Sequence, residues 1–336
     1  MVRIGINGFG RIGRAFLRLL IQEGREAEVV AVNDLGDVHG LAYLLKYDSV
    51  YGKAPFEVRV EGNALVVNGK TIQVLAEKDP AKLPWGTLGV DVVVESTGLF
   101  TDFAKAKAHL DAGAKRVVIS APAKGEVGSG ETILMGLNED KLSTCQMTSN
   151  ASCTTNAASP VIAILDAAIG IEKAVLNTTH SYTATQAIVD GPSKKGVREG
   201  RAAALNMIPS STGAAIAVTQ AYPSLSGKFD GISIRVPTPA GSIADITFIA
   251  KRETTVEEVN AALRAAATDS RWQGIFTATD EELVSHDIVG DTHGSIADLT
   301  MTRVVGGNLV KVLAWYDNEM GYTHTLVEHV MKAARS

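Results

Sequence analysis

The sequence contains little cysteine, few aromatic residues and no long apolar run. Its two cysteines, Cys145 and Cys153, are not at Cys-x-x-Cys spacing, so neither a disulfide framework nor a structural zinc site is expected. The chain starts at Met1 without a charged leader and apolar core, and no apolar stretch has membrane-spanning length. We therefore expect a cytoplasmic protein with no membrane partner.

The sequence also has no surplus of positive charge. It carries 32 Lys and Arg against 37 Asp and Glu, a formal net charge of -5, which argues against nucleic acid as a main partner. No grouping of potential ligands has the spacing of a metal site. With 336 residues, of which 46% are hydrophobic, the chain can bury a large core, and its length favours two domains.

Short β-branched runs alternate with helical stretches in the first half, which predicts an α/β fold with a Rossmann-type, doubly wound parallel sheet. From Ala174 onward the expected strands are longer and indicate an α+β catalytic domain with a mainly antiparallel sheet. The expected strands are 2–7, 29–33, 91–94, 117–119, 147–149, 174–179, 231–236, 243–250 and 309–315.

Three other segments carry local signals. Thr255 and Glu258 form a capping-box pattern that predicts a helix extending through Ala267. Residues 184–213 are rich in Gly, Ser, Lys and Arg and are too long for a simple connector, which indicates a functional loop. Residues 321–334 have helical periodicity and are expected to pack back against the first domain.

A Gly-x-Gly-x-x-Gly motif, Gly8, Gly10 and Gly13, directly follows the first expected strand and begins an amphipathic helix. In this context the glycines permit close approach of a pyrophosphate, whose charge the helix start favours. Asp34 ends the next strand, where an acid binds the adenosine ribose and repels a 2′-phosphate, so NAD is predicted rather than NADP. The strand ends at residues 95–98 and 120–122 are as consistent with ordinary turns as with cofactor contact.

Cys153 lies between an expected strand and an apolar helix pattern, at or near a helix N-terminus. Unpaired amides there favour a thiolate and predict a lowered thiol pKa. His180, at the end of the strand that begins near Ala174, is the candidate base. Cys145 is expected to be a small buried residue in a strand, and the other histidines are expected to be solvated or core residues.

A cysteine–histidine pair alone would suit a hydrolase or an acyltransferase equally well. Joined to a dinucleotide-binding domain, it points to aldehyde oxidation, because a thiol adds to an aldehyde to give a thiohemiacetal. Loss of hydride from that adduct to nicotinamide leaves a thioester.

The sequence resembles the glyceraldehyde-3-phosphate dehydrogenase family along essentially its whole length. The blocks that carry the resemblance are residues 6–14, 44–49, 149–156, 180–183, 211–215, 235–239 and 315–319. The resemblance implies a homotetramer in which residues 1–151 and 316–336 form the NAD-binding domain and residues 152–315 the catalytic domain. It also implies that residues 184–213 pack between subunits near the cofactor.

The resemblance assigns roles residue by residue. It implies Cys153 as nucleophile and His180 as its activator. It implies that Thr183 and Arg235 hold the phosphate of glyceraldehyde 3-phosphate, and that Ser152, Thr154, Thr212 and Gly213 hold inorganic phosphate. Cofactor contacts are implied for Arg11, Ile12, Lys78, Ser120 and Asn318, beside the three motif glycines and Asp34. Either Arg198 or Arg201 could reach a phosphate, and the sequence does not choose between them.

Some positions depart from the family pattern. Ala157 stands where many members have a second cysteine, which excludes an intrahelical disulfide with Cys153, and Lys78 stands where arginine is frequent. The predicted reaction is NAD-dependent, phosphorylating oxidation of glyceraldehyde 3-phosphate to 1,3-bisphosphoglycerate. The alternatives are a relative that acts on erythrose 4-phosphate with water as acyl acceptor, a non-catalytic binding protein, and a cofactor-independent cysteine hydrolase.

Overall fold

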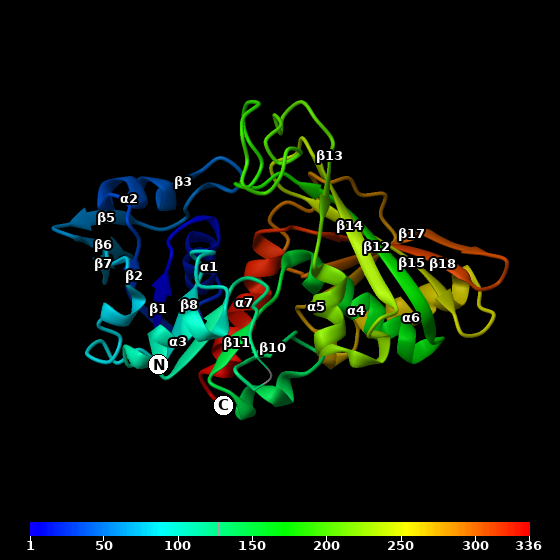
Figure 1. Ribbon diagram of the computed structural model, residues 1–336, viewed down its shortest axis with the longest axis horizontal. Helices are drawn as coiled ribbons and strands as arrows, with labels where there is room; N and C mark the ends of the chain where they lie inside the picture. Colours follow the sequence, from blue (N-terminus) through cyan, green and yellow to red (C-terminus); the bar gives the residue numbers. More distant parts are fainter. Residues whose placement is uncertain (127) are drawn as a thin grey trace. The chain divides into compact units, whose positions relative to one another are not determined.

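The computed structural model describes residues 1–126 and 128–336 (Figure 1). The chain forms two compact units. The first comprises residues 1–133, 139–151 and 323–336, and the second comprises residues 134–138 and 152–322. Residues 134–138 and 316–322, which the family resemblance assigns to the NAD-binding domain, lie in the second unit.

The first unit is built on a nine-stranded sheet of order β10-β11-β9-β8-β1-β2-β7-β6-β5. Strands β10 through β7 in that order are parallel, and β6 and β5 continue the sheet as antiparallel strands. The strands are β1 (Val2–Asn7), β2 (Ala27–Asn33), β5 (Val58–Glu61), β6 (Ala64–Val67), β7 (Lys70–Leu75), β8 (Val92–Glu95), β9 (Arg116–Ile119), β10 (Glu131–Thr132) and β11 (Met147–Ser149).

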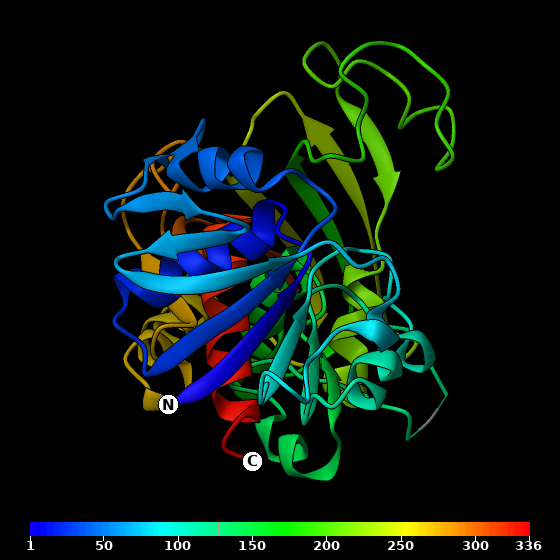
Figure 2. The same cartoon turned by 90° about the vertical axis from the view of Figure 1, so that its left-hand side faces the viewer.

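The remaining elements of this unit cover and connect the sheet. They are α1 (Arg11–Gln22), α2 (Val38–Lys46), the hairpin β3 (Tyr47–Asp48) and β4 (Gly52–Lys53), α3 (Phe103–Asp111), the short 3₁₀ turns η1 (Pro80–Lys82) and η2 (Glu139–Thr144), and most of α7 (Met320–Ala333). In Figure 2 the strands of the sheet, blue to cyan, lie side by side, with α7 in red behind them. The ring of His329 on α7 bonds the Thr148 hydroxyl of β11, so α7 is fastened to this sheet.

The second unit is built on a seven-stranded sheet of order β13-β14-β12-β15-β18-β17-β16. Only β12/β14 and β16/β17 are parallel pairs, so the sheet is mainly antiparallel. The strands are β12 (Ile171–Ser181), β13 (Ile208–Ser211), β14 (Phe229–Val236), β15 (Ser242–Ala250), β16 (Phe276–Thr279), β17 (Ser295–Val305) and β18 (Leu309–Tyr316).

Helices cover one face of this second sheet (Figure 1). They are α4 (Cys153–Ala168), α5 (Ala214–Ala221) and α6 (Val256–Ala267), with the 3₁₀ turns η3 (Pro223–Leu225) and η4 (Ser270–Trp272). Val161, Ile162 and Leu165 of α4 are fully buried against Ile246 and Phe248 of β15 and their neighbours in one apolar core. Burial of such side chains contributes about 1.5–3 kcal/mol each and is what anchors α4.

The predicted fold class is confirmed, while two local expectations need correction. The Thr255 hydroxyl accepts the Glu258 amide at the start of α6, but the Glu258 carboxylate accepts bonds from Arg252 and Thr254 and so does not complete the box. Cys145 lies between η2 and β11, outside any strand, and is half-buried.

Candidate active site

The glycine motif joins β1 to α1 at the carboxyl end of the parallel sheet. Gly8 has φ +96°, and a Cβ there would lie 2.6 Å from the Thr97 amide nitrogen. A Cβ on Gly13 would lie 2.3 Å from the Gly8 carbonyl oxygen. Both positions therefore require glycine for the backbone to pass, which is the physical basis of the motif.

Gly10 has a different surrounding. A Cβ there would meet nothing within 4 Å, and α1 begins after Gly10 without a side-chain cap from any described residue. Beside it is a pocket of about 460 Å³. The pocket is lined by Asn7, Gly8, Gly10, Asn33, Asp34, Leu35, Glu77, Lys78, Ser96, Thr97, Leu99 and Phe100. A helix start open to a cavity of this size is suited to a phosphate-bearing ligand.

Asp34 is positioned at this pocket by two backbone bonds. Its carboxylate oxygens accept the amides of Phe9 at 2.8 Å and Gly36 at 2.9 Å. Each oxygen keeps a lone pair for a further donor, so a ribose diol fits the carboxylate and a 2′-phosphate would be repelled by its charge. The two acceptor oxygens of Asp34 therefore fit the adenosine ribose of NAD.

The other predicted cofactor residues lie in different surroundings. Lys78 lines the pocket and is exposed. The Arg11 side chain bonds Asp48 at 2.5 Å and lies over the Tyr51 ring, and Ile12 is the next residue of α1. Ser120 follows β9 and is half-buried. Asn318, in the second unit, is buried, and its Oδ1 accepts the Ser242 hydroxyl at 2.9 Å.

A buried polar network lies beneath the pocket. The Trp85 indole donates to His109 Nδ1 at 3.0 Å, which leaves the His109 proton on Nε2, 3.0 Å from a Glu95 oxygen. The other Glu95 oxygen accepts the Thr97 amide at 2.8 Å, and Asn7 also donates to Glu95. Thr97 and Asn7 line the pocket, as does Asn33, and none of the three was assigned from the sequence. For Asn7 and Asn33 the available signal was their position at strand ends, next to Gly8 and Asp34.

Cys153 is the first residue of α4. The helix starts there because the Ser152 hydroxyl accepts the Thr155 amide at 3.1 Å and so serves as the N-cap. The Cys153 sulfur lies 3.3 Å from Nε2 of His180, which is near the end of β12 and is buried. The two residues predicted as nucleophile and base are thus within hydrogen-bond reach.

Arg235 completes this cluster from β14, where it is paired in register with His180. Its Nη1 lies 2.7 Å from His180 Nδ1 and 3.3 Å from the Ser181 carbonyl oxygen. The same Nδ1 lies 2.7 Å from that carbonyl oxygen. The Arg235 guanidinium, the His180 imidazole and the Cys153 thiol are therefore successive neighbours, and they extend from β14, β12 and the start of α4.

The electrostatics of the pair differ from the expectation. Burial raises the pKa of the Cys153 thiol and outweighs the positive charge of Arg235 and the amides at the helix start, so the predicted net lowering is wrong. Burial, and then the charge of Arg235, lowers the pKa of His180 to about 3. At neutral pH both groups of the free site are uncharged, and activation requires transfer of the thiol proton.

Tyr316 is a site residue that sequence reasoning missed. Its hydroxyl lies 2.9 Å from the Thr154 hydroxyl and 2.7 Å from the Thr178 hydroxyl, and its ring meets the His180 ring edge-on at 5.8 Å between centroids. Burial raises the pKa of this phenol, which stays neutral. Its place in the block 315–319, which carries the family resemblance, could have pointed to it. Its hydrogen-bond partners are 138 and 162 residues away in sequence, so no local pattern indicates these contacts.

The predicted phosphate ligands other than Arg235 lie after β12 and at the starts of α4 and α5. Thr183 follows β12 and is half-buried, with its hydroxyl near Thr185 and Gln186. Thr212 and exposed Gly213 precede α5, where the Thr212 hydroxyl accepts the Ala214 amide. The hydroxyls of Ser152 and Thr154 are engaged with Thr155 and Tyr316.

The segment between β12 and β13 extends from the sheet, in green in Figures 1 and 2. Buried Glu199 organises it by accepting the Gln186 amide and the Ser210 hydroxyl. Arg198 and Arg201 are both exposed on this loop, and Arg201 pairs with Asp190 at 3.0 Å.

Ala157 lies one turn along α4 from Cys153 and is fully buried, with its carbonyl accepting the Ser295 hydroxyl. Cys145 is half-buried, 3.8 Å from the Lys141 carbonyl, and burial raises the pKa of its thiol. Residues 1–126 and 128–336 contain no group of three potential metal ligands, and none of their helices is long and apolar enough to span a bilayer.

The sequence matches two domain families that together cover most of the chain. Residues 2–103 match the glyceraldehyde 3-phosphate dehydrogenase NAD binding domain, and residues 152–318 match the glyceraldehyde 3-phosphate dehydrogenase C-terminal domain. A glyceraldehyde-3-phosphate dehydrogenase of Streptomyces coelicolor is 50% identical over 97% of both chains. Those of Mycobacterium avium and Mycobacterium tuberculosis are 50% and 51% identical over 100% of this chain and 99% of theirs.

The chain belongs to the glyceraldehyde-3-phosphate dehydrogenase family. This membership confirms the predicted family, the predicted enzyme class of NAD-dependent oxidoreductase, and NAD as cofactor. The pocket beside Gly10 and Asp34 lies within the matched NAD binding domain, and the Cys153 centre lies within the matched C-terminal domain.

Proposed function

We propose that this chain oxidises glyceraldehyde 3-phosphate to 1,3-bisphosphoglycerate with inorganic phosphate as acyl acceptor and Cys153 as covalent nucleophile. The observation that carries the proposal is the 3.3 Å approach of the Cys153 sulfur to His180 Nε2 at the start of α4. A thiol in this position adds to an aldehyde, because an imidazole within hydrogen-bond reach can take its proton.

The chain's own residues support each stage. His180 accepts the thiol proton as the carbon–sulfur bond forms, and the Cys153 amide at the helix start faces the developing oxyanion. The His180 imidazolium then returns its proton to this oxyanion, which gives the thiohemiacetal hydroxyl, and the neutral imidazole removes that hydroxyl proton as the hydride leaves the same carbon. NAD, when bound, would accept the hydride, and the loss of that hydride oxidises the thiohemiacetal to a thioester.

Phosphate must meet the chain at two places in this reaction. Arg235 and Thr183 are the proposed partners of the substrate's phosphate, with the guanidinium as a bidentate donor. Ser152, Thr154, Thr212 and Gly213 are the proposed partners of inorganic phosphate, whose oxygen attacks the thioester carbon while the Cys153 thiolate leaves. With the Ser152 and Thr154 hydroxyls engaged in the protein, backbone amides at the starts of α4 and α5 are the expected donors there.

The test is NADH absorbance with glyceraldehyde 3-phosphate and NAD, with and without inorganic phosphate, and with NADP and erythrose 4-phosphate as comparators. Rapid NADH formation that requires phosphate is the expected result. Turnover without phosphate would replace the proposal by a hydrolytic relative, and NAD binding without turnover on either aldehyde would indicate a non-catalytic protein.

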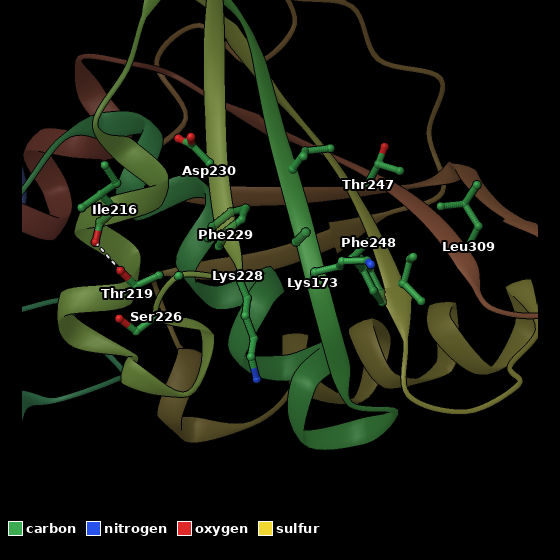
Figure 3. Close-up of a pocket in the computed structure, with 14 residues that line it drawn as sticks. Lys173, Ile216, Thr219, Ser226, Lys228, Phe229, Asp230, Thr247, Phe248 and Leu309 are labelled. Atoms are coloured by element: carbon green, nitrogen blue, oxygen red, sulfur yellow. Dashed lines mark hydrogen bonds between the residues drawn. The ribbon is translucent and has the colours of Figure 1, made fainter.

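We also propose that the chain forms a homotetramer. The face of the seven-stranded sheet opposite α4 and α6 carries exposed apolar side chains around a hollow of about 680 Å³ (Figure 3). Val175 lines the hollow, and Ile232 lies beside it, two residues along β14 from Asp230 of the lining; both are more than half exposed. Ile216 of α5 and Leu309 of β18 also line the hollow and extend the apolar surface. Exposed apolar surface of this kind is typical of a protein interface.

Sedimentation equilibrium tests the assembly. Val175→Glu combined with Ile232→Glu is expected to reduce the tetramer to a smaller species, because the new charges would be buried unpaired. Val284→Glu, at an apolar residue that is equally exposed but does not line the hollow, is the matched control and should leave the mass unchanged. A tetramer unaffected by the double change would remove this face as the interface.

The proposed compartment is the cytoplasm. Cys145 and Cys153 are free thiols, and the proposed chemistry requires Cys153 to be reduced, which a reducing compartment provides. Fractionation of cells that produce the tagged chain tests this, and recovery outside the cytoplasm would contradict it.

A further inference from the structure

Glu95, the last residue of β8, is a buried side chain whose two carboxyl oxygens are fully used. One oxygen accepts the amide of Thr97 at 2.8 Å and also the Thr97 hydroxyl. The other accepts the side-chain amide of Asn7 at 2.5 Å and lies 3.0 Å from Nε2 of His109. These contacts occupy the acceptor sites of both oxygens and leave neither free to carry a proton, so Glu95 is ionised.

Trp85 determines which nitrogen of His109 carries the proton. Its indole N–H can only donate and lies 3.0 Å from Nδ1, so Nδ1 is an acceptor and the proton is on Nε2. An imidazolium would place a second proton on Nδ1, opposite the indole N–H. Trp85 is fully buried against β1, where a Cβ on Gly5 would lie 2.8 Å from its ring. His109 therefore acts as a neutral N–H donor to Glu95.

The orientation of the Asn7 amide is fixed from its other end. Asn33 Nδ2 donates to Asn7 Oδ1 at 2.7 Å, so Nδ2 is the atom of Asn7 that faces Glu95. Asn33 is itself oriented by the Glu77 backbone, whose amide donates to Asn33 Oδ1 at 2.8 Å and whose carbonyl accepts from Nδ2 at 2.8 Å. The carboxyl ends of β1, β2 and β8 are thus joined by side-chain hydrogen bonds.

The network reaches one wall of the pocket beside Gly10, which is formed by Thr97, Leu99 and Phe100. The Thr97 hydroxyl, which donates to Glu95, accepts the Leu99 amide at 3.0 Å. The His109 ring meets the Phe100 ring edge-on at 6.3 Å between centroids. Glu95 and His109 do not line the pocket themselves, but they hold the residues that do.

The turn after Glu95 is also in contact with the glycine motif. The Ser96 hydroxyl donates to the Gly8 carbonyl oxygen at 2.7 Å, and a Cβ on Gly8 would lie 2.6 Å from the Thr97 amide nitrogen. Because the two backbones touch, a shift of this turn would move the glycine loop as well. The position that Glu95 gives to Thr97 therefore also fixes the loop that a pyrophosphate must approach.

We propose that Glu95 is a positioning residue for cofactor binding. As an anion held by Asn7, Thr97 and His109, it keeps the pocket wall and the glycine loop in the conformation that binds NAD, and Trp85 supports it by fixing the tautomer of His109. Without the anion the free protein must reorganise before NAD binds, which lowers the affinity. The inference goes beyond the proposed function, because it concerns NAD binding and does not depend on the acyl acceptor.

The first test is Glu95→Gln, which keeps the shape of the side chain but replaces one acceptor oxygen by an NH₂ group. That group must face either the Thr97 amide or the donors of Asn7 and His109, so one set of donors loses its acceptor. We expect the Kd for NAD, measured by titration calorimetry, to rise about tenfold. ADP-ribose, which lacks the nicotinamide, should weaken by the same factor. An unchanged Kd for either ligand would overturn the inference.

The matched control is Asp166→Asn, which changes another largely buried carboxylate. Asp166 accepts the Ile171 amide and the hydroxyls of Tyr222 and Ser224, and it does not line the pocket. Its loss should lower the urea midpoint but leave the Kd for NAD within about twofold of the parent. An equal loss of NAD affinity in Asp166→Asn would mean that Glu95→Gln acts through general destabilisation, which would overturn the inference.

A pair of variants at His109 keeps the inference testable if Glu95→Gln does not fold. His109→Gln retains an N–H donor for Glu95 and should keep the Kd for NAD within about threefold of the parent. His109→Leu removes that donor and should raise the Kd about tenfold. Equal Kd values for the two variants would overturn the role of the His109 donor.

A measurement on the unmodified chain tests the tautomer directly. Trp85 is one of three tryptophans, and ultraviolet resonance Raman spectra with Trp85→Phe as the blank should show a strongly hydrogen-bonded indole N–H. A Trp85 indole without a hydrogen bond would overturn the inference, because Nδ1 of His109 would then not be the acceptor. None of these measurements requires turnover, so failure of the NADH assay would count against the proposed function alone.

Discussion

The cofactor pocket of the first unit and the Cys153 centre of the second depend on different parts of the chain. Around the pocket, glycine backbone and strand-end amides make the shape, and Asp34 is held by two amides. Around Cys153, the protonation states and charges of side chains determine the chemistry. The backbone mainly fixes the positions from which these side chains extend. Backbone requirements are visible in a sequence motif, whereas the protonation of a side-chain cluster depends on contacts made across the fold.

The sharpest test of this contrast is Cys153→Ser. We expect kcat to fall by at least about 10⁴-fold, because the hydroxyl is a far weaker nucleophile, while NAD affinity stays within about twofold. NADH formation and calorimetric NAD titration measure the two quantities. Cys145→Ser is the matched control and should retain full activity; an active Cys153→Ser enzyme would refute the covalent role.

The glycine motif offers a matched pair within one loop. Gly13→Ala should destabilise the fold by about 1–3 kcal/mol, because its Cβ would lie 2.3 Å from the Gly8 carbonyl oxygen. Gly10→Ala should leave the free energy of unfolding within about 0.5 kcal/mol of the parent, because its methyl group would project into open space. It should lower the affinity for NAD, because that space lies beside the pocket. Urea unfolding and NAD titration separate these effects, and equal destabilisation by both changes would contradict the assignment.

Asp34→Asn tests the part of the pocket that does depend on a charge. The amide oxygen can still accept one backbone N–H, but the charge is lost, so NAD affinity should fall about tenfold, and NADP should be rejected less strongly. The ratio of kcat/KM for the two cofactors is the measurement. Asp37→Asn, at the cap of α2 and not among the pocket-lining residues, is the control; an unchanged ratio in Asp34→Asn would remove its role in selectivity.

His329 gives the smallest expected effect and concerns stability alone. Burial, and then Lys332, lowers its pKa to about 3 from an ordinary 6.5, while its ring bonds Asn150 and Thr148. The unfolded chain therefore binds a proton that the folded chain does not, and stability that is complete above pH 6.5 is lost as the pH falls toward 3. His329→Gln should reduce the slope of the free energy of unfolding against pH by up to about 1.4 kcal/mol per pH unit.

Urea midpoints between pH 7 and pH 5 measure this slope. His39→Gln, at an exposed histidine, is the control and should leave the slope as it is in the parent. If His329→Gln and the parent lose stability in parallel as the pH falls, another group is responsible.

Much of the fold was predictable because strand length and apolar content coincide in the central strands. The expected strands at 2–7, 29–33 and 147–149 correspond to β1, β2 and β11, and the long strands of the second sheet were found with their ends short by a few residues. Strands β5 and β7 were missed because exposed charged and polar residues interrupt their apolar pattern, and β6 because it has only four residues. Strand β17 was missed because Asp298, Thr300 and Arg303 interrupt its apolar pattern.

The parts of the candidate site that depend on residues close together in the sequence could be predicted. Gly8, Gly13 and Asp34 follow from a motif and a strand end, and Cys153 follows from a helix start. The contact of Arg235 with His180, the hydroxyl chain from Thr154 through Tyr316 to Thr178, and the rise in the thiol pKa depend on strand pairing and burial. Those are properties of the tertiary structure that no spacing in the sequence encodes.

The buried methyl group of Ala157 limits how this centre can recover from oxidation. A sulfenic acid on Cys153 is rescued most simply by a neighbouring thiol, and the next turn of α4 supplies none. Recovery then depends on a small thiol from solution, such as glutathione, reaching the sulfur before a second oxidant does. The chain would therefore lose or keep its activity under peroxide according to the thiol supply around it, and that dependence is set by a residue that takes no part in the reaction.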